Sequence, residues 1–138
     1  FKVSLVVADA CFLPYRENAF DWAISVAALH NITGKEARRK ALYELKAVLK
    51  PGGEAFITVW NRWQPRFWLR SKEVEIPWRL KNKTVYRYYY LFSYRELKEL
   101  TAEVGFEVVA IFPEKSYRLP LKLFSENICL LVRKPVLG

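Results

Sequence analysis

The chain has 138 residues, a length that fits one folded domain and not two. Hydrophobic residues make up 52% of the composition, which is enough for a packed core and excludes a disordered chain. Lys and Arg number 23 against 14 Asp and Glu, so the formal net charge is +9. This charge favours a polyanionic partner such as RNA, DNA or an anionic membrane surface. The alternative is that the cations only solubilise a surface rich in aromatic residues.

Several further classes are excluded by the absence of their signals. No apolar run approaches the roughly 18 residues of a membrane span, and the N-terminus has no signal-peptide pattern. The two cysteines, Cys11 and Cys129, and the single histidine, His30, are too few for a disulfide framework or a multi-histidine metal site. We therefore expect a protein of the reducing cytoplasm that does not act at a membrane. The chain begins at Phe1 and contains no Met, so we expect it to be part of a longer chain.

Two short apolar runs lie near the start of the chain. Residues 3–8, VSLVVA, are almost continuously apolar, which predicts a buried parallel strand. Glu17 and Asn18 give a turn signal, and residues 20–26, FDWAISV, predict a second buried strand.

A helix with clear boundary signals follows. Thr33 can cap its N-terminus, and Glu36, three residues later, completes a capping box. Pro51, Gly52 and Gly53 are expected to end the helix, and residues 55–60, AFITVW, predict a third strand. Apolar residues at helical spacing predict its buried face: Ala41, Leu42, Leu45, Val48 and Leu49. The basic residues are expected to lie largely elsewhere on the helix: Lys35, Arg38, Arg39 and Lys46.

Residues 61–92 differ in composition from the segments on either side. Aromatic and basic residues alternate through this stretch, which is too polar for a core element and too aromatic for an ordinary linker. Residues 61–100 contain ten Lys and Arg and four Asp and Glu, which is +6 of the chain's +9. We interpret residues 61–92 as an insertion that packs partly on the domain and partly faces a ligand.

The C-terminal part of the chain predicts one more helix and two strands. Ser93 and Glu96 have the spacing of a second capping box, and Gly105 is expected to end that helix. Residues 106–112, FEVVAIF, and residues 128–133, ICLLVR, predict the last two strands. The order of elements predicts an open α/β sheet that is mostly parallel, with the last two strands pairing antiparallel at its edge because no helix connects them.

Four short motifs follow one another in a fixed order along the chain. They are VADA at residues 7–10, LPY at 13–15, FDWAIS at 20–25 and LKPGG at 49–53. Together they resemble the second half of a class I S-adenosylmethionine (SAM)-dependent methyltransferase, and the resemblance extends over nearly all of residues 1–138 as one domain. It implies a Rossmann-like sheet. The chain lacks the family's glycine-rich loop, since none of its five glycines begins a strand–loop–helix fingerprint, so the first strands of the family are expected to be missing.

The resemblance implies SAM as cofactor and gives roles to residues at two strand ends. Asp9 would accept a hydrogen bond from the adenine amino group, and the backbone N–H of Ala10 would meet the ring. Val26 and Ala27, at the end of the next strand, would border the methionine part. These positions agree with the edge at which open α/β sheets bind ligands. The alternative for Asp9 is a simple turn or helix cap.

Three segments resemble one branch of the family more closely. They are ISVAALHN at residues 24–31, FITVW at 56–60 and VYRYYYLF at 85–92. They look like the tRNA wobble-uridine carboxymethyl methyltransferases, which methylate a carboxylate on a modified uridine. The resemblance implies tRNA as substrate and, as for eukaryotic members, a small zinc-binding activator subunit as partner. Where the family pattern has His, this chain has Tyr90 and Asn31.

A carboxylate acceptor needs little acid–base catalysis, because it is already ionised at neutral pH. Catalysis then depends on placing the acceptor oxygen in line with the methyl group. We therefore take His30, Arg87 and Tyr88 as candidate catalytic residues that orient the substrate. The alternatives are a loop histidine that caps the next helix, for His30, and a surface cation over a neighbouring aromatic ring, for Arg87.

RNA would explain the aromatic and basic composition of residues 61–92, because unpaired bases stack on aromatic rings beside cations. The alternative is that these rings cover the sheet.

Two other functions stay open. Residues 30–33, HNIT, together with LKPGG also resemble quinone-type small-molecule methyltransferases. A non-catalytic half-domain that binds RNA or a partner is the third reading. A steep loss of tRNA binding with salt would favour the RNA enzyme.

Overall fold

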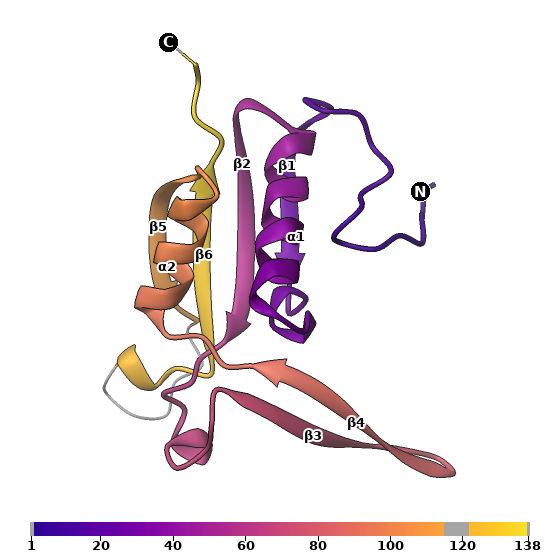
Figure 1. Cartoon of the computed structure of the whole chain (residues 1–138), viewed down its shortest axis with the longest axis vertical. Coiled ribbons are helices and arrows are strands. Elements are labelled where there is room, and N and C mark those ends of the chain that lie inside the picture. Colours follow the sequence, from indigo (N-terminus) through magenta and orange to yellow (C-terminus); the bar gives the residue numbers. More distant parts are fainter. Residues whose placement is uncertain (1, 115–121, 138) are drawn as a thin grey trace.

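The computed structural model describes residues 2–114 and 122–137, which form a mixed α/β fold with a separate two-stranded hairpin (Figure 1). The strands and α-helices are β1 (Phe20–Val26), α1 (Lys35–Val48), β2 (Leu49–Trp60), β3 (Glu73–Leu80), β4 (Lys83–Tyr90), α2 (Tyr94–Glu103), β5 (Glu107–Pro113) and β6 (Asn127–Arg133). Three short 3-10 helices are η1 (Leu29–Asn31), η2 (Pro65–Phe67) and η3 (Lys122–Phe124). No helix of the described residues has the length and apolar character needed to cross a membrane.

The main sheet has four strands in the order β1-β2-β6-β5. β1 and β2 are parallel, whereas β6 is antiparallel to both β2 and β5, so three strands run one way and β6 runs the other. The predicted Rossmann-like α/β sheet with an antiparallel strand is confirmed. The structure adds that β6 is inserted between β2 and β5, which makes β5 the outer strand. This position gives β6 a partner on each side and explains why its residues 128–132 are continuously apolar.

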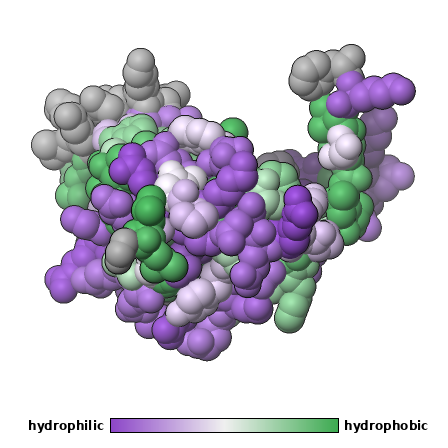
Figure 2. Space-filling model, turned by 90° about the horizontal axis from the view of Figure 1, so that it is seen from above, coloured by the Kyte–Doolittle hydropathy of each residue, from purple (hydrophilic) through white to green (hydrophobic). Residues whose placement is uncertain are grey.

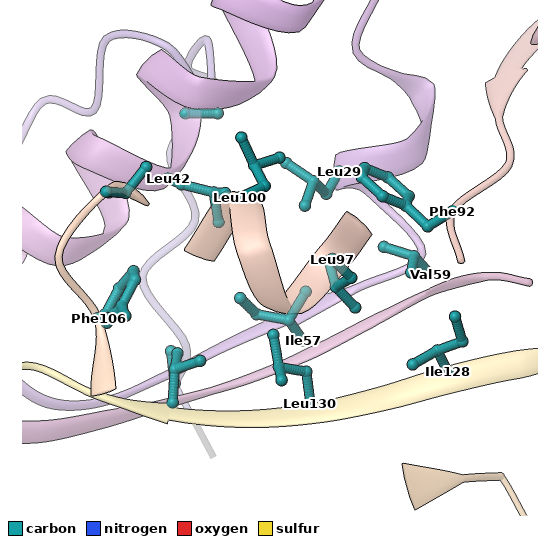
Figure 3. Close-up of a cluster of buried hydrophobic side chains, with 14 of the residues drawn as sticks. Leu29, Leu42, Ile57, Val59, Phe92, Leu97, Leu100, Phe106, Ile128 and Leu130 are labelled. Atoms are coloured by element: carbon teal, nitrogen blue, oxygen red, sulfur yellow. The ribbon is translucent and has the colours of Figure 1, made fainter. Parts of the chain in front are cut away.

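Both α-helices cover the same face of the sheet (Figure 1). In Figure 3, Leu42 of α1 and Leu97 of α2 lie above Ile57 of β2 and Leu130 of β6. All four side chains are at most 1% exposed. Burying a leucine or isoleucine contributes roughly 1.5–3 kcal/mol, so this layer is the main source of stability of the fold.

Residues 3–8 do not form the predicted strand, and this prediction is wrong. They lie in an irregular segment before β1, where Leu5 is 89% exposed and Val7 fully exposed. Figure 2 shows hydrophobic residues gathered on this segment where it projects from a largely hydrophilic surface. A strand needs a neighbour for its backbone hydrogen bonds, and no strand of the described residues pairs with β1 on its other side.

The boundaries of α1 also differ from the prediction. Gly34, with a φ of 92°, is the N-cap residue, and no side chain caps the helix, so the capping box of Thr33 and Glu36 is wrong. The helix ends at Val48 rather than at Pro51, which lies within β2. Leu49 is fully buried and pairs with Phe20, so the chain joins the sheet before it reaches the proline.

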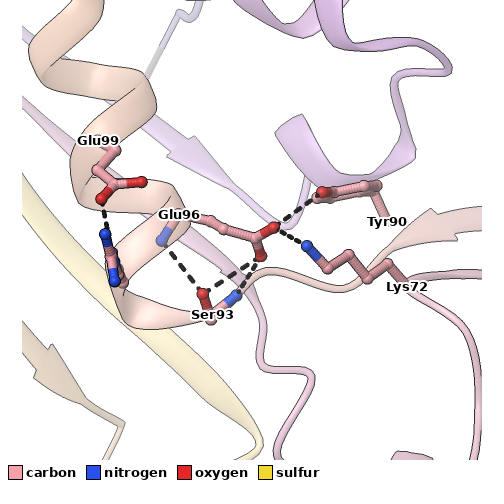
Figure 4. A network of polar contacts seen from close by, with 6 residues as sticks. Lys72, Tyr90, Ser93, Glu96 and Glu99 are labelled. Carbon is pink, nitrogen blue, oxygen red and sulfur yellow. Dashed lines mark hydrogen bonds and ion pairs between the residues drawn. The ribbon is translucent and has the colours of Figure 1, made fainter.

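The start of α2 agrees with the prediction. Ser93 and Glu96 form a capping box in which Ser93 Oγ accepts from the Glu96 N–H at 3.1 Å and Glu96 Oε2 accepts from the Ser93 N–H at 3.1 Å (Figure 4). Gly105, which follows the helix, has a φ of 93°, a conformation that glycine adopts without strain. This cap fixes the direction in which the chain passes from the end of β4 into α2.

Candidate active site

The carboxyl ends of β1 and β2 are joined by hydrogen bonds at a sharp turn. The Ala27 N–H donates to the Thr58 carbonyl at 3.2 Å and to Thr58 Oγ1 at 3.1 Å. Ala27 has a φ of 52°, in the left-handed region that a non-glycine residue rarely adopts. Such strained residues cluster at functional sites. Val26, just before it, is 59% exposed, so both residues expected to border the cofactor lie at an open strand end.

Asp9 and Ala10 lie in a turn that precedes β1. Asp9 Oδ1 accepts a hydrogen bond from the Cys11 N–H at 2.8 Å, so the carboxylate does stabilise a turn, as its alternative interpretation predicts. A carboxylate has further acceptor capacity, and Asp9 is exposed, so its other oxygen can accept from an adenine amino group. The residues present therefore fit the adenine side of SAM.

Ala10 shares an apolar pocket of about 340 Å³ with residues of β1 and α1. Ser25 and Ala28, on either side of Val26 and Ala27, line the same pocket. The structure therefore brings together the two chain segments that were expected to contact the cofactor. No charged side chain of the described residues lines this pocket, and its hydroxyl-bearing side chains are Tyr15 and Ser25.

His30 is 1% exposed and lies in η1, immediately after the end of β1. Its Nδ1 accepts a hydrogen bond from the Trp60 N–H at 2.8 Å, and its ring packs against the rings of Trp60 and Tyr89 at 5.5 and 5.1 Å. Burial lowers the pKa of His30 to about 4, so the ring is neutral at pH 7. With Nδ1 an acceptor, the proton lies on Nε2. His30 thus ties η1 to the end of β2 and does not cap α1.

Tyr88 is held beside η1 by contacts to its backbone and its hydroxyl. Asn31 Nδ2 donates to the Tyr88 carbonyl at 2.9 Å. The Tyr88 hydroxyl donates to Glu73 Oε1 at 2.8 Å and accepts from Arg38 Nη1 at 3.2 Å. Burial and the hydrogen bond to Glu73 raise the pKa of Tyr88, so it stays protonated. The bonds from Asn31 and Arg38 attach the β3–β4 hairpin to η1, just after the carboxyl end of β1, and to α1.

Arg38 is a buried residue beside the candidate site whose position the sequence did not predict. It was expected on the solvated side of α1, but it is only 4% exposed. Its guanidinium lies 3.9 Å from the centre of the Tyr90 ring, and Nη1 also donates to the Ile32 carbonyl at 2.9 Å. The Tyr90 hydroxyl in turn donates to Glu96, which also pairs with Lys72 (Figure 4). No signal in the linear sequence places Arg38 under the hairpin, because its hairpin partner Tyr88 lies 50 residues away.

Arg87 lies apart from this network. Side chains of adjacent strand residues point to opposite faces, so Arg87 is on the face of the hairpin opposite to Tyr88. Its Cζ lies 4.3 Å from the centre of the Trp78 ring, which is the alternative that the sequence analysis left open. The structure therefore brings His30 and Tyr88 to the strand ends and places Arg87 along the hairpin.

Comparisons with known proteins agree with this geometry. A family model described as "Methyltransferase domain" matches residues 1–57. A SAM-dependent methyltransferase structure from Methanosarcina mazei superposes with a TM-score of 0.75 at 19% identity, over 96% of this chain and 67% of that chain. A second, from Clostridium acetobutylicum, superposes with a TM-score of 0.75 at 13% identity, over 97% and 65%. The fold is therefore that of the SAM-dependent methyltransferases.

Curated relatives give a narrower similarity. The tRNA (carboxymethyluridine(34)-5-O)-methyltransferase of Arabidopsis thaliana is 54% identical over 81 residues, which covers 51% of this chain and 19% of the relative. The protein of the same name from Schizosaccharomyces pombe is 29% identical over 126 residues, covering 73% and 55%. The chain thus spans about half or less of the length of these relatives. The resemblance to wobble-uridine carboxymethyl methyltransferases, first seen in short motifs, is confirmed.

Proposed function

We propose that this chain is part of a SAM-dependent methyltransferase that methylates the carboxylate of a modified wobble uridine in tRNA. The observation that carries the proposal is the attachment of a basic, aromatic hairpin beside the carboxyl ends of β1 and β2, through the 2.9 Å hydrogen bond from Asn31, just after β1, to the Tyr88 carbonyl and the stacking of Tyr89 on Trp60 at the end of β2. Open α/β sheets bind their ligands beyond these strand ends. An RNA held by the hairpin would therefore present a nucleotide there. The names of the relatives support the same substrate.

The chemistry requires placement more than proton transfer. When bound, SAM supplies a methyl group on a positively charged sulfur, and attack by the carboxylate oxygen forms the C–O bond as the C–S electron pair returns to sulfur. No proton moves, because the carboxylate is ionised at neutral pH. The neutral ring of His30 agrees with this, since a pKa of about 4 makes it a poor general base at pH 7. The chain's contribution is then to orient the reacting groups.

Each predicted site residue has a role in this proposal. Asp9 and Ala10 would contact the adenine, and the strand end at Val26 and Ala27 would border the methionine part. His30 positions η1 against β2, next to the reacting groups. Arg87 and Tyr88 would contact the RNA from the two faces of the hairpin.

We further propose the partners and the compartment that the resemblance and the composition imply. These are tRNA, a small zinc-binding activator subunit, and the reducing cytoplasm. The two free cysteines, Cys11 and Cys129, are compatible with that compartment.

Two measurements test the proposal. Calorimetric titration of S-adenosylhomocysteine should show binding to the chain that Asp9→Ala weakens. Transfer of a radiolabelled methyl group from SAM to an anticodon stem-loop with 5-carboxymethyluridine at the wobble position should give a base-labile ester. The same RNA with unmodified uridine is the control and should stay unlabelled. Labelling of a quinone precursor instead of the RNA would contradict the proposal.

A further inference from the structure

We propose that one face of the β3–β4 hairpin, around Trp78 and Arg87, binds an unpaired nucleobase next to the nucleotide that is methylated. We call this surface the Trp78 face. It comprises Ile76, Trp78, Leu80, Lys83, Val85 and Arg87. The inference rests on the proposed function and adds to it which aromatic rings contact the RNA and how.

The aromatic rings of the hairpin fall into two groups. Tyr89 is 4% exposed and stacks on Trp60, with ring centres 3.9 Å apart and planes at 6°. The Tyr88 hydroxyl accepts from Arg38 of α1, and the Tyr90 hydroxyl donates to Glu96 of α2, as described above. These three rings hold the hairpin against the rest of the fold, at β2, α1 and α2. Trp78 and Tyr86, by contrast, are 41% and 67% exposed and lie further along the hairpin, on opposite faces. Trp78 differs from Tyr86 in having a guanidinium over its ring, that of Arg87, and tryptophan is costly to leave in water.

The strand register gathers the Trp78 face on one side of the hairpin. Three cross-strand pairs, Ile76 with Arg87, Trp78 with Val85 and Leu80 with Lys83, place their side chains on the same face. The Arg87 guanidinium lies over the Trp78 ring at 4.3 Å and still leaves much of the ring exposed. An aromatic ring next to a guanidinium is the arrangement that stacks an unpaired base and neutralises its phosphate.

The charge of the hairpin selects a polyanion as the occupant of this face. Residues 76–87 contain four basic residues and no Asp or Glu: Arg79, Lys81, Lys83 and Arg87. The acidic residues of the hairpin, Glu73 and Glu75, lie at its base, and Glu73 is bonded to Tyr88. A second copy of this surface would bring like charges together, which opposes self-association.

The distance along β4 separates this nucleobase from the methylated one. Tyr88 is held at the strand ends by Asn31, whereas Val85, opposite Trp78, lies three residues away, or about 10 Å at 3.3 Å per residue. A base on Trp78 is therefore a neighbour of the acceptor nucleotide. Its loss should raise the KM for RNA and leave kcat nearly unchanged.

The experiment measures binding of a labelled, unmodified anticodon stem-loop by fluorescence anisotropy. Trp78→Ala should weaken binding by about 5- to 100-fold, the range for loss of one base–aromatic stack, and Trp78→Phe should recover most of it. Trp22→Ala is the matched control, because Trp22 is 59% exposed on β1 and lies outside the hairpin. A fully paired RNA of the same length should lose no affinity with Trp78→Ala.

Salt dependence separates stacking from charge. Arg87→Ala should lower the slope of log affinity against log salt by about one, because one phosphate contact is lost. Trp78→Ala should leave that slope unchanged while it weakens binding at every salt concentration. Hydrogen exchange of the β3–β4 amides in each variant checks that the hairpin is still formed.

The outcomes distinguish this inference from the function on which it rests. If the wild-type chain binds the stem-loop and Trp78→Ala binds it equally well with an intact hairpin, the inference is overturned and the proposed function stands. If the wild-type chain binds no RNA at low salt, both are overturned. If Trp78→Ala instead converts a dimer to a monomer in sedimentation and RNA affinity is unchanged, the Trp78 face is a contact between copies, and the inference is wrong.

Discussion

Two apolar runs with nearly the same pattern have opposite fates in this molecule. Residues 3–8, VSLVVA, and residues 128–133, ICLLVR, both predict a buried strand. The second run lies in β6, where Ile128, Leu130 and Val132 are fully buried. The first run has no strand, and Leu5 is 89% exposed. The two runs do not differ in their capacity to form a strand, since both are short and rich in β-branched residues or leucine.

The difference lies in the neighbours that each run finds. β6 has β2 on one side and β5 on the other, and two helices cover one face of this sheet. Among the described residues, no strand pairs with residues 3–8. β1 is intermediate, because it pairs with β2 on one side only, and its Trp22 and Ile24 are 59% and 72% exposed. An apolar run thus specifies a strand only where a sheet edge and a covering layer are both present.

Hydrogen exchange should show the largest contrast between the two runs. The amides of Ile128–Val132 lie in a central strand, so they should exchange only through global unfolding, with protection of at least about 10³-fold. The amides of residues 3–8 should exchange at nearly the rate of an unfolded chain. Mass spectrometry of deuterium uptake by peptides from each run measures both. Strong protection of residues 3–8 would mean that the segment finds a partner in solution, and the comparison would fail.

Truncating one leucine in each run tests the same contrast energetically. Leu130→Ala removes a fully buried side chain and should lower the free energy of unfolding by about 2–5 kcal/mol. Leu5→Ala removes an exposed side chain and should change it by less than about 0.5 kcal/mol. Urea unfolding followed by circular dichroism gives both values. Equal effects of the two substitutions would contradict the assignment of burial to one run alone.

The pH dependence of stability tests the hydrogen bond between His30, just after β1, and Trp60, at the end of β2. The pKa of His30 is about 4 in the folded chain and near 6.5 in an unfolded one, so the unfolded state binds more protons between these values. Stability is therefore complete above about pH 7 and falls as the pH drops from 6.5 towards 4. The difference of about 2.5 in pKa corresponds to on the order of 3 kcal/mol.

The control for this prediction is His30→Gln, because a glutamine oxygen can accept from the Trp60 N–H but does not titrate. Urea unfolding at several pH values between 4.5 and 7.5 should show that the wild-type chain loses more stability on acidification than the variant. Carboxylates titrate in both proteins and cancel in this difference. Parallel curves would show that His30 is not buried as a neutral ring.

Local signals explain which parts of the fold the sequence predicted well. The capping box of Ser93 and Glu96 and the Gly105 turn depend on neighbours within a few residues. The same kind of signal was wrong at Thr33, because Gly34 moved the cap, and at Pro51, because pairing of Leu49 with Phe20 started the strand earlier. Local chemistry is decisive only where no tertiary contact competes with it.

The candidate site depends on tertiary placement, and for that reason less of it was predictable. Motifs predicted Asp9, Ala10, Val26 and Ala27 as cofactor contacts, which stays a prediction; the structure places Ala10 in one pocket with Ser25 and Ala28, the neighbours of Val26 and Ala27. The burial of Arg38 beneath the hairpin had no local signal. It results from three elements, α1, β3 and β4, that meet only in the folded chain.

The smallest predicted effect concerns Ala27, where the open strand β1 ends. Its φ of 52° strains a residue that carries a Cβ, by about 1 kcal/mol or more, and glycine would remove this strain while adding flexibility to the unfolded chain. Ala27→Gly should therefore raise the free energy of unfolding by a few tenths of a kcal/mol to about 1 kcal/mol. Ala37→Gly in α1 is the matched control and should lower it by about 0.5–1 kcal/mol, because that alanine is helical. Opposite signs would show that the strand end is held in a conformation that its own residue disfavours, as expected where position serves a site more than stability. A loss of stability in both variants would show that Ala27 is unstrained in solution and that the turn is set by its bonds to Thr58 alone.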